Sequence, residues 1–256
     1  MTRVAKQAAL NRTVFTQTTF ESRALTVLTT LLHRFNEPGR FQVLIRHPSR
    51  PVRELVVRVS KEASKLQVNL DLAGSPASQR GCCDADDDIE VAVGGVVGFY
   101  PSSGVDGYRV TIARIPARVS GAGETGEGHQ QHDREEPGKE RLELDNEAGV
   151  PVGDLFSVVL ARPGRYLLTA NDARANVVVA LPQRERLRTD QPTLVRLSTT
   201  GFEPASLELL AGRAVVVLCE VPAGIKVEFL EPESGQEKGR PRKYSYRKPR
   251  PTAVNP

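Results

Sequence analysis

The side chains best suited to a defined interaction are concentrated at the C-terminus. No acidic residue occurs from Lys238 to Pro256, while lysine and arginine recur throughout this tail. Lys and Arg neutralise phosphates, and Tyr244 and Tyr246 can stack on unpaired bases. We therefore predict nucleic-acid binding through Lys238, Arg240, Pro241, Arg242, Lys243, Arg247, Lys248 and Arg250. The alternatives are an import signal, docking on an acidic protein surface, and a solvated tail without a specific role.

Within this tail, the string KGRPRK over Lys238–Lys243 resembles the AT-hook. The resemblance implies an extended Gly-Arg-Pro core in the DNA minor groove. Proline keeps the backbone extended, glycine permits close approach to the groove floor, and arginines enter the narrow groove of A·T sequence. Glu237 departs from the pattern, which has a basic residue or proline at that position.

Metal-ligating side chains are sparse. His129 and His132 lie three residues apart in a polar, glycine-rich segment, whereas a metal site needs preorganised ligands, usually four. The alternating aspartates within 84–88 begin like an EF-hand loop, but Ile89 follows where that loop needs glycine. We predict no metal and no cofactor.

Residue patterns typical of catalysis are also lacking. The sequence contains no nucleophile elbow, phosphate loop or dinucleotide fingerprint. The glycines of 94–98 lie inside a β-like run and indicate a bulged or closely packed strand. Cys82, Cys83 and Cys219 are odd in number and two are adjacent, which indicates reduced thiols. We predict a protein that is not an enzyme; the alternative is a site assembled from scattered loop residues.

The first regular element is predicted to be an amphipathic helix over about 20–35. Apolar residues recur there at helical spacing, from Phe20 through Leu25 and Leu28 to Phe35. Thr19 is a suitable N-cap, and a Pro-Gly pair at 38–39 ends the pattern. We expect this helix to pack on the protein's own sheet; docking on a partner is the alternative.

After this segment the hydrophobic period changes to two, which predicts strands. The first block has strands at 41–45, 54–59, 66–72, 89–99 and 108–115. The second has strands at 142–144, 155–160, 166–169, 177–181, 193–197, 206–210, 214–219 and 225–230. Between them, 120–140 lacks any large apolar residue and is predicted to be a linker or a long loop.

These patterns predict a mainly β protein, with one or two antiparallel β-sandwich or barrel domains and one N-terminal helix. We divide the chain into an arm (1–19), a helix plus β-domain (20–118), a linker (119–140), a β-sandwich domain (141–231) and a basic tail (232–256). Pro-Gly-Arg precedes Phe41 and also Tyr166, and a Gly-Arg pair precedes Ala214. This degenerate repeat indicates two or three similar β-units.

Two strings of the second block, 156–181 and 202–217, resemble the closing PG-x-Y hairpin and the opening F-x-P strand of cupredoxins. They also resemble immunoglobulin-like sandwiches. The cupredoxin copper site needs two His, a Cys and usually Met. The closing hairpin has neither His nor Cys, and no His follows Cys219. The resemblance therefore implies the fold without an intact copper site.

Composition sets few limits on function. The net charge is +4 and the isoelectric point is about 9.1, and no apolar run approaches the ~18 residues that span a membrane. We predict a non-catalytic interaction or assembly protein with a protein partner and with self-association as a further option. The alternative is a cupredoxin-like domain that binds a small ligand. We expect an intracellular location, nuclear in preference to mitochondrial.

Overall fold

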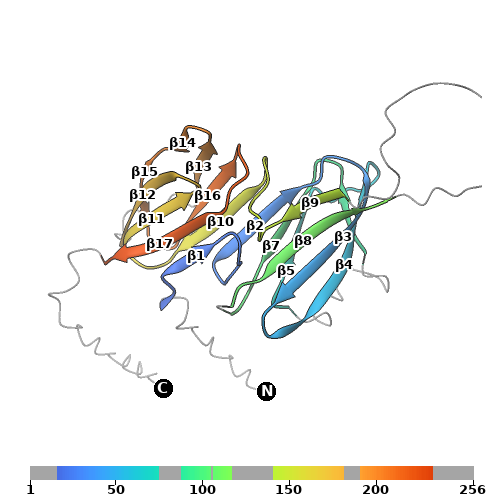
Figure 1. Ribbon diagram of the computed structural model, residues 1–256, viewed down its shortest axis with the longest axis horizontal. Helices are drawn as coiled ribbons and strands as arrows, with labels where there is room; N and C mark the ends of the chain where they lie inside the picture. Colours follow the sequence, from blue (N-terminus) through green and yellow to red (C-terminus); the bar gives the residue numbers. More distant parts are fainter. Residues whose placement is uncertain (1–15, 75–87, 105, 117–140, 182–190, 233–256) are drawn as a thin grey trace, which may run out of the picture.

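The computed structural model describes residues 16–74, 88–104, 106–116, 141–181 and 191–232, and their regular elements are all β-strands (Figure 1). They form three sheets. The C-terminal sheet has the order β1 (Thr19–Glu21), β17 (Ile225–Glu231), β11 (Gly164–Ala170), β12 (Ala173–Ala180) and β15 (Ser206–Leu210). The N-terminal sheet has the order β6 (Asp88–Ala92), β4 (Arg50–Ser60), β3 (Gly39–His47), β8 (Arg109–Ile115) and β9 (Arg141–Asp145).

The third sheet, which we call the middle sheet, has seven strands and runs through both halves of the molecule. Its order is β14 (Gly201–Glu203), β13 (Thr193–Ser198), β16 (Arg213–Cys219), β10 (Leu155–Leu160), β2 (Thr29–Arg34), β7 (Val96–Tyr100) and β5 (Gln67–Asp71). The antiparallel pair β2–β10 joins the two halves. These two strands lie side by side at the centre of Figure 1.

The chain passes between the sheets as a β-solenoid of about four turns. Strands β4, β5, β6 and β7 alternate between the N-terminal and middle sheets, so β6 lies parallel to β4 and β7 lies parallel to β5. Strands β12, β13, β15 and β16 repeat this course between the C-terminal and middle sheets. The other pairings of the described strands are antiparallel.

The predicted β-sandwich or barrel is therefore wrong, and so is the resemblance to cupredoxins and immunoglobulin-like domains. Short strands of period two separated by Gly and Pro turns fit a chain that winds through three sheets equally well. The local pattern specifies where strands begin and end, but not which strands become neighbours. The predicted strands agree closely with observed ones, except that 89–99 forms two strands separated by a turn at Gly94. Strands β1, β2 and β14 were not predicted.

The predicted helix over 20–35 is also wrong. Its residues form β1, a turn and β2. In β2 the side chains of Leu31 and His33 are buried, while those of Leu32 and Arg34 are not. Apolar residues four positions apart satisfy both a helical and an alternating pattern, and pairing on both sides of β2 decides between them.

The two halves repeat the same strand order. Strands β2 to β8 correspond to β10 to β17, with β14 as an extra strand of the second half. Gly39 is the first residue of β3, and Gly164, 125 positions later, is the first residue of β11. Each is the glycine of a Pro-Gly-Arg string. Leu31 and Phe156 are also 125 positions apart and are therefore equivalent residues of the two halves, and they pair with each other in the β2–β10 ladder. This pair therefore lies on a pseudo-two-fold axis that relates the halves.

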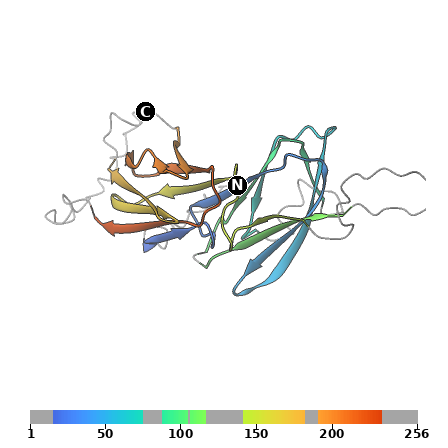
Figure 2. The same cartoon turned by 45° about the horizontal axis from the view of Figure 1, so that its top comes forward.

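The first strand of each half lies in the other half's sheet. Strand β1 precedes β2 but pairs with β17, while β9 precedes β10 but pairs with β8. In Figures 1 and 2 the blue β1 accordingly lies beside the red β17. The β1–β2 connection and the β9–β10 connection meet at a hydrogen bond, which Asn146 Nδ2 donates to the Ser22 carbonyl at 2.8 Å. Both residues are fully buried. One hydrophobic cluster extends through both halves.

Candidate functional site: the outer face of the middle sheet

The residues predicted to bind nucleic acid, Lys238 to Arg250, lie outside the described residues. The same holds for the His129–His132 pair, for Cys82 and for Cys83. Asp88 is described, and its carboxylate lies 3.3 Å from Arg58 and 3.6 Å from Arg40 in ion pairs on the N-terminal sheet. Among the described residues, no group of three or more His, Cys, Asp or Glu side chains is placed to hold a metal ion. The described residues also form no helix long and apolar enough to span a membrane.

A buried histidine and a buried carboxylate connect the two halves. His33 Nδ1 lies 2.7 Å from Asp154 Oδ2, and the other carboxylate oxygen accepts a hydrogen bond from the Arg34 amide at 3.2 Å. The edge of the His33 ring packs against Phe35, with the ring centroids 4.7 Å apart. Both side chains face the core, so this pair links β2 to the start of β10 and is not accessible to a substrate.

Cys219 lies beside this pair, and its thiol is unsuited to nucleophilic chemistry. Burial, together with the nearby Asp154 carboxylate, raises the pKa of the thiol to about 12. A nucleophilic cysteine needs a lowered pKa and access to solvent, whereas Cys219 is completely buried. The sequence did not indicate this neighbourhood, because the three residues come from positions far apart in the chain.

A second polar group surrounds Tyr108 at the end of the N-terminal sheet. The tyrosine hydroxyl is buried and has no hydrogen-bond partner among the described residues. The His47 ring lies 4.4 Å from the Tyr108 ring, centroid to centroid, and the Arg50 guanidinium lies 5.8 Å from the ring centroid. Burial raises the pKa of Tyr108.

The feature that best fits a binding site is the face of the middle sheet turned away from the other two sheets. Leu31 and Phe156, which pair directly, are fully buried, and both flanking sheets pack on this inner side. The opposite face, which we call the outer face, carries several apolar residues that are not fully buried. Among them are Leu32, Val96, Tyr100, Leu155, Val159, Leu194, Ala214, Val216 and Leu218.

Cross-strand pairing makes these residues one continuous surface. Leu155 pairs with Leu32 on one side and with Leu218 on the other. Val216 pairs with Leu194, whose side chain is 52% exposed. Contiguous apolar surface of this kind is unusual on a soluble monomer and typically marks an interaction site.

The outward surfaces of the two flanking sheets differ from it in character. The N-terminal sheet carries Arg40, Arg58 and Asp88 in ion pairs. On the C-terminal sheet, Lys226 Nζ lies 2.6 Å from Glu228 Oε1. These sheets therefore carry charged pairs on their outer faces, as expected of a surface that contacts water, beside single exposed apolar residues such as Val178 and Leu230.

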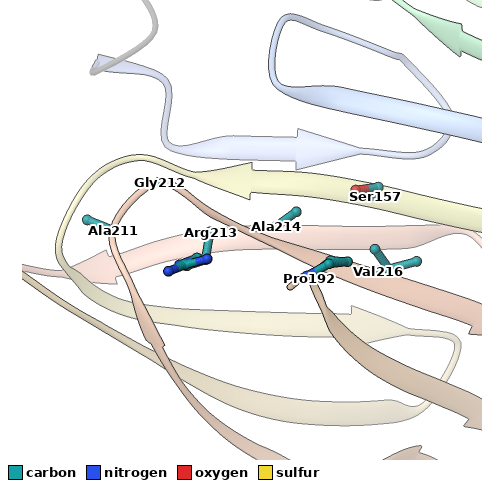
Figure 3. A pocket seen from close by; sticks show the side chains of 7 residues that line it. All are labelled: Ser157, Pro192, Ala211, Gly212, Arg213, Ala214 and Val216. Atoms are coloured by element: carbon teal, nitrogen blue, oxygen red, sulfur yellow. The ribbon is translucent and has the colours of Figure 1, made fainter. Parts of the chain in front are cut away.

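The outer face is hollowed at one end (Figure 3). The hollow has a volume of about 510 Å³. It is formed by Ser157, Pro192, Ala211, Gly212, Arg213, Ala214 and Val216. Ser157, Ala214 and Val216 come from the adjacent strands β10 and β16, and Pro192 precedes β13. A hollow of this size, with mainly apolar walls, one hydroxyl and the Arg213 side chain, can hold an apolar group of a ligand.

A sequence signal for this face existed but was not used. Strands β10 (LFSVVL) and β16 (RAVVVLC) are nearly continuous apolar runs, whereas β3 (GRFQVLIRH) alternates more clearly. Continuous runs are typical of strands with an apolar environment on both faces. The prediction treated them only as generic strands of a sandwich.

No protein-family model, no curated protein and no solved structure matches this chain.

Proposed function

We propose that this chain is a non-catalytic interaction and assembly protein whose binding surface is the outer face of the middle sheet. The observation that carries the proposal is the contrast between this face and those of the flanking sheets. Leu32, Leu155 and Leu218 form an uninterrupted apolar row across three strands, while the flanking sheets carry ion pairs. Covering such a row with a partner removes apolar surface from water, which favours association.

The inaccessible position of the titratable pair supports a non-catalytic role. A general base must come within hydrogen-bond reach of a substrate, but the His33 and Asp154 side chains are only 7% and 4% exposed. They are better explained as a link between β2 and β10.

Site-specific photocrosslinking in the intact chain tests this proposal. A photoreactive amino acid at Ser157, on the outer face, is expected to give a discrete protein adduct in cells that produce the chain. The same amino acid at Asn176, an exposed position of β12 in the C-terminal sheet, is the matched control. Equal labelling from the two positions, or no adduct from Ser157, would contradict the proposal.

A second candidate function is nucleic-acid binding by the basic tail, and it is favoured by the run of charge beginning at Lys238. Phosphate contacts made by lysine and arginine weaken steeply as salt rises. The full chain is therefore expected to bind duplex DNA in a salt-dependent manner. A chain ending at Pro232, after β17 is complete, is expected to lose that binding. Equal affinity of the two chains would exclude the tail as the binding element.

A further inference from the structure

The outer face carries a projecting side chain next to a hollow, which makes it complementary to itself. Resting on the proposed function, we infer that two copies of this chain pack face to face through their outer faces. The two middle sheets then lie at the centre of the dimer, and the flanking sheets remain on its outside. The apolar row of Leu32, Leu155 and Leu218 becomes the middle of the interface.

Leu194 is the projecting side chain, and it is 52% exposed. It pairs across the β13–β16 ladder with Val216, which forms part of the wall of the hollow. The hollow, at about 510 Å³, has room for a leucine side chain. A two-fold axis close to Val216 places Leu194 of each copy in the hollow of the other. A contact that uses the same patch on both copies is closed, and it yields a dimer.

The charges of the outer face lie at its margins. Glu203 on β14 lies directly opposite Arg196 on β13, so these two charges compensate each other within one chain. Arg34 ends β2, and Asp71 ends the edge strand β5. Arg213 begins β16, in the wall of the hollow. Like charges brought together in an interface oppose association, and two superposed faces bring none into its centre.

The centre of the face is neutral and mainly apolar. The outward residues of β10 are Leu155, Ser157 and Val159, and β7 presents Val96 and Tyr100 on the same side. Neither strand carries an outward charge. A charge-depleted apolar centre with an aromatic residue, inside a polar margin, is the usual composition of a protein–protein interface.

The size of the face suits a dimer. Adjacent strands lie ~4.8 Å apart and each residue advances a strand by ~3.3 Å, so seven strands of about five residues cover roughly 500 Å². Two faces in contact therefore bury about 1,000 Å², the area that a specific interface needs. A short peptide would leave much of the same face in contact with water.

The shape of the face also matches a second copy. Two twisted sheets pack face to face ~10 Å apart with their strands nearly aligned. The flanking sheets of this chain carry ion pairs on their outward surfaces. Among the sheets that the structure describes, the apolar face complementary to the outer face is thus the same face of another copy.

Sedimentation equilibrium of the full chain, after nuclease treatment, tests the inference. The expected mass at high concentration is twice the 28.0 kDa of the chain, with dissociation on dilution. Leu194→Glu is expected to weaken the dimer about 100-fold, because a carboxylate left unpaired in an apolar hollow costs about tenfold and each dimer contains two.

Val178→Glu is the matched control, because Val178 is an exposed apolar residue of the C-terminal sheet. This variant is expected to dimerise as the unchanged chain does. Equal unfolding midpoints of the monomeric forms show that neither variant has lost its fold. A monomer at every concentration, a dimer that only untreated samples form, or a dimer that Leu194→Glu leaves intact would overturn the inference.

The Ser157 photocrosslink identifies the occupant without a disruptive variant. When two differently tagged copies of the chain are produced together, the adduct from Ser157 is expected to carry both tags. An adduct with a different protein would leave the proposed function standing and exclude the second copy as the occupant. Absence of any protein adduct would contradict the proposed function as well.

Discussion

The buried His33–Asp154 pair has consequences for stability that mutation can measure. Asp154→Ala leaves His33 Nδ1 and the Arg34 amide without their acceptors in the core. Removing one partner of a buried pair costs about 3 kcal/mol or more, so we expect a loss of that size in the free energy of unfolding, measured by urea denaturation. The double variant His33→Leu/Asp154→Ala is expected to lose much less than the sum of the two single losses. Additive losses would show that the two side chains do not interact.

The Cys219 thiol is expected to be unreactive in the folded chain. Cys82→Ser/Cys83→Ser makes Cys219 the single cysteine of the sequence. Because burial raises its pKa to about 12, almost no thiolate is present at pH 8, and reagent access requires unfolding. We expect labelling by a chromogenic disulfide to be slow in buffer and fast in urea. Rapid labelling without denaturant would mean that β16 opens readily.

The same raised pKa values predict a stability that falls at high pH. The thiol of Cys219 has an ordinary pKa of 9.0 and one of about 12 here. Burial raises the pKa of Tyr166 from 10.0 to about 12. Each group ionises more easily when unfolded, so its stabilisation is complete below its ordinary pKa and is lost as pH rises towards 12. We expect the free energy of unfolding to decline above pH 9, and less so in Tyr166→Phe. An unchanged slope in this variant would contradict the role of Tyr166.

At the scale of elements, the two equivalent glycines that begin β3 and β11 tolerate a methyl group differently. A Cβ on Gly164 would lie 2.4 Å from the Glu231 carbonyl oxygen and 2.5 Å from the Phe229 ring. A Cβ on Gly39 would meet its nearest neighbours, the side-chain nitrogens of Arg114, at 3.4 Å.

We therefore expect Gly164→Ala to lower the free energy of unfolding by about 3 kcal/mol, the upper range for overpacking. Gly39→Ala is expected to cost less, about 1 kcal/mol, because the methyl group has room and the cost comes from the φ of +159° at Gly39. Thermal and urea unfolding of the two variants, compared under the same conditions, check the difference. Similar costs at both positions would show that the β11–β17 contact adjusts to the added methyl group.

The elements also show how far the sequence could be interpreted. Period-two strands such as 166–169 and 206–210 were predicted nearly as observed, because one face of each contacts the core and the other does not. The helix over 20–35 was wrong because Leu31 and Phe35 fit either period, and only pairing with β10 and β7 selects the strand. The outer face was missed because the apolar runs of β10 and β16 do not indicate which side remains uncovered.

At the scale of the whole molecule, each half depends on the other for its first strand. Strand β1 completes the C-terminal sheet, β9 completes the N-terminal sheet, and β2–β10 joins the halves. A chain carrying a protease site within 120–140 is thus expected to remain one particle after cleavage. We expect both fragments to co-elute in size-exclusion chromatography and to separate only in denaturant. Separation in buffer would show that each half is an independent domain.

The pseudo-two-fold axis also has a consequence for how the halves can differ. In a dimer of identical chains, every residue at the axis occurs twice, so a histidine–aspartate pair at the junction would be duplicated. Here the positions equivalent to His33 and Asp154 are Val158 and Thr29, which face each other in the same ladder. Covalent linkage of the repeats thus permits one polar connection and one largely apolar connection at a junction that strict symmetry would make uniform.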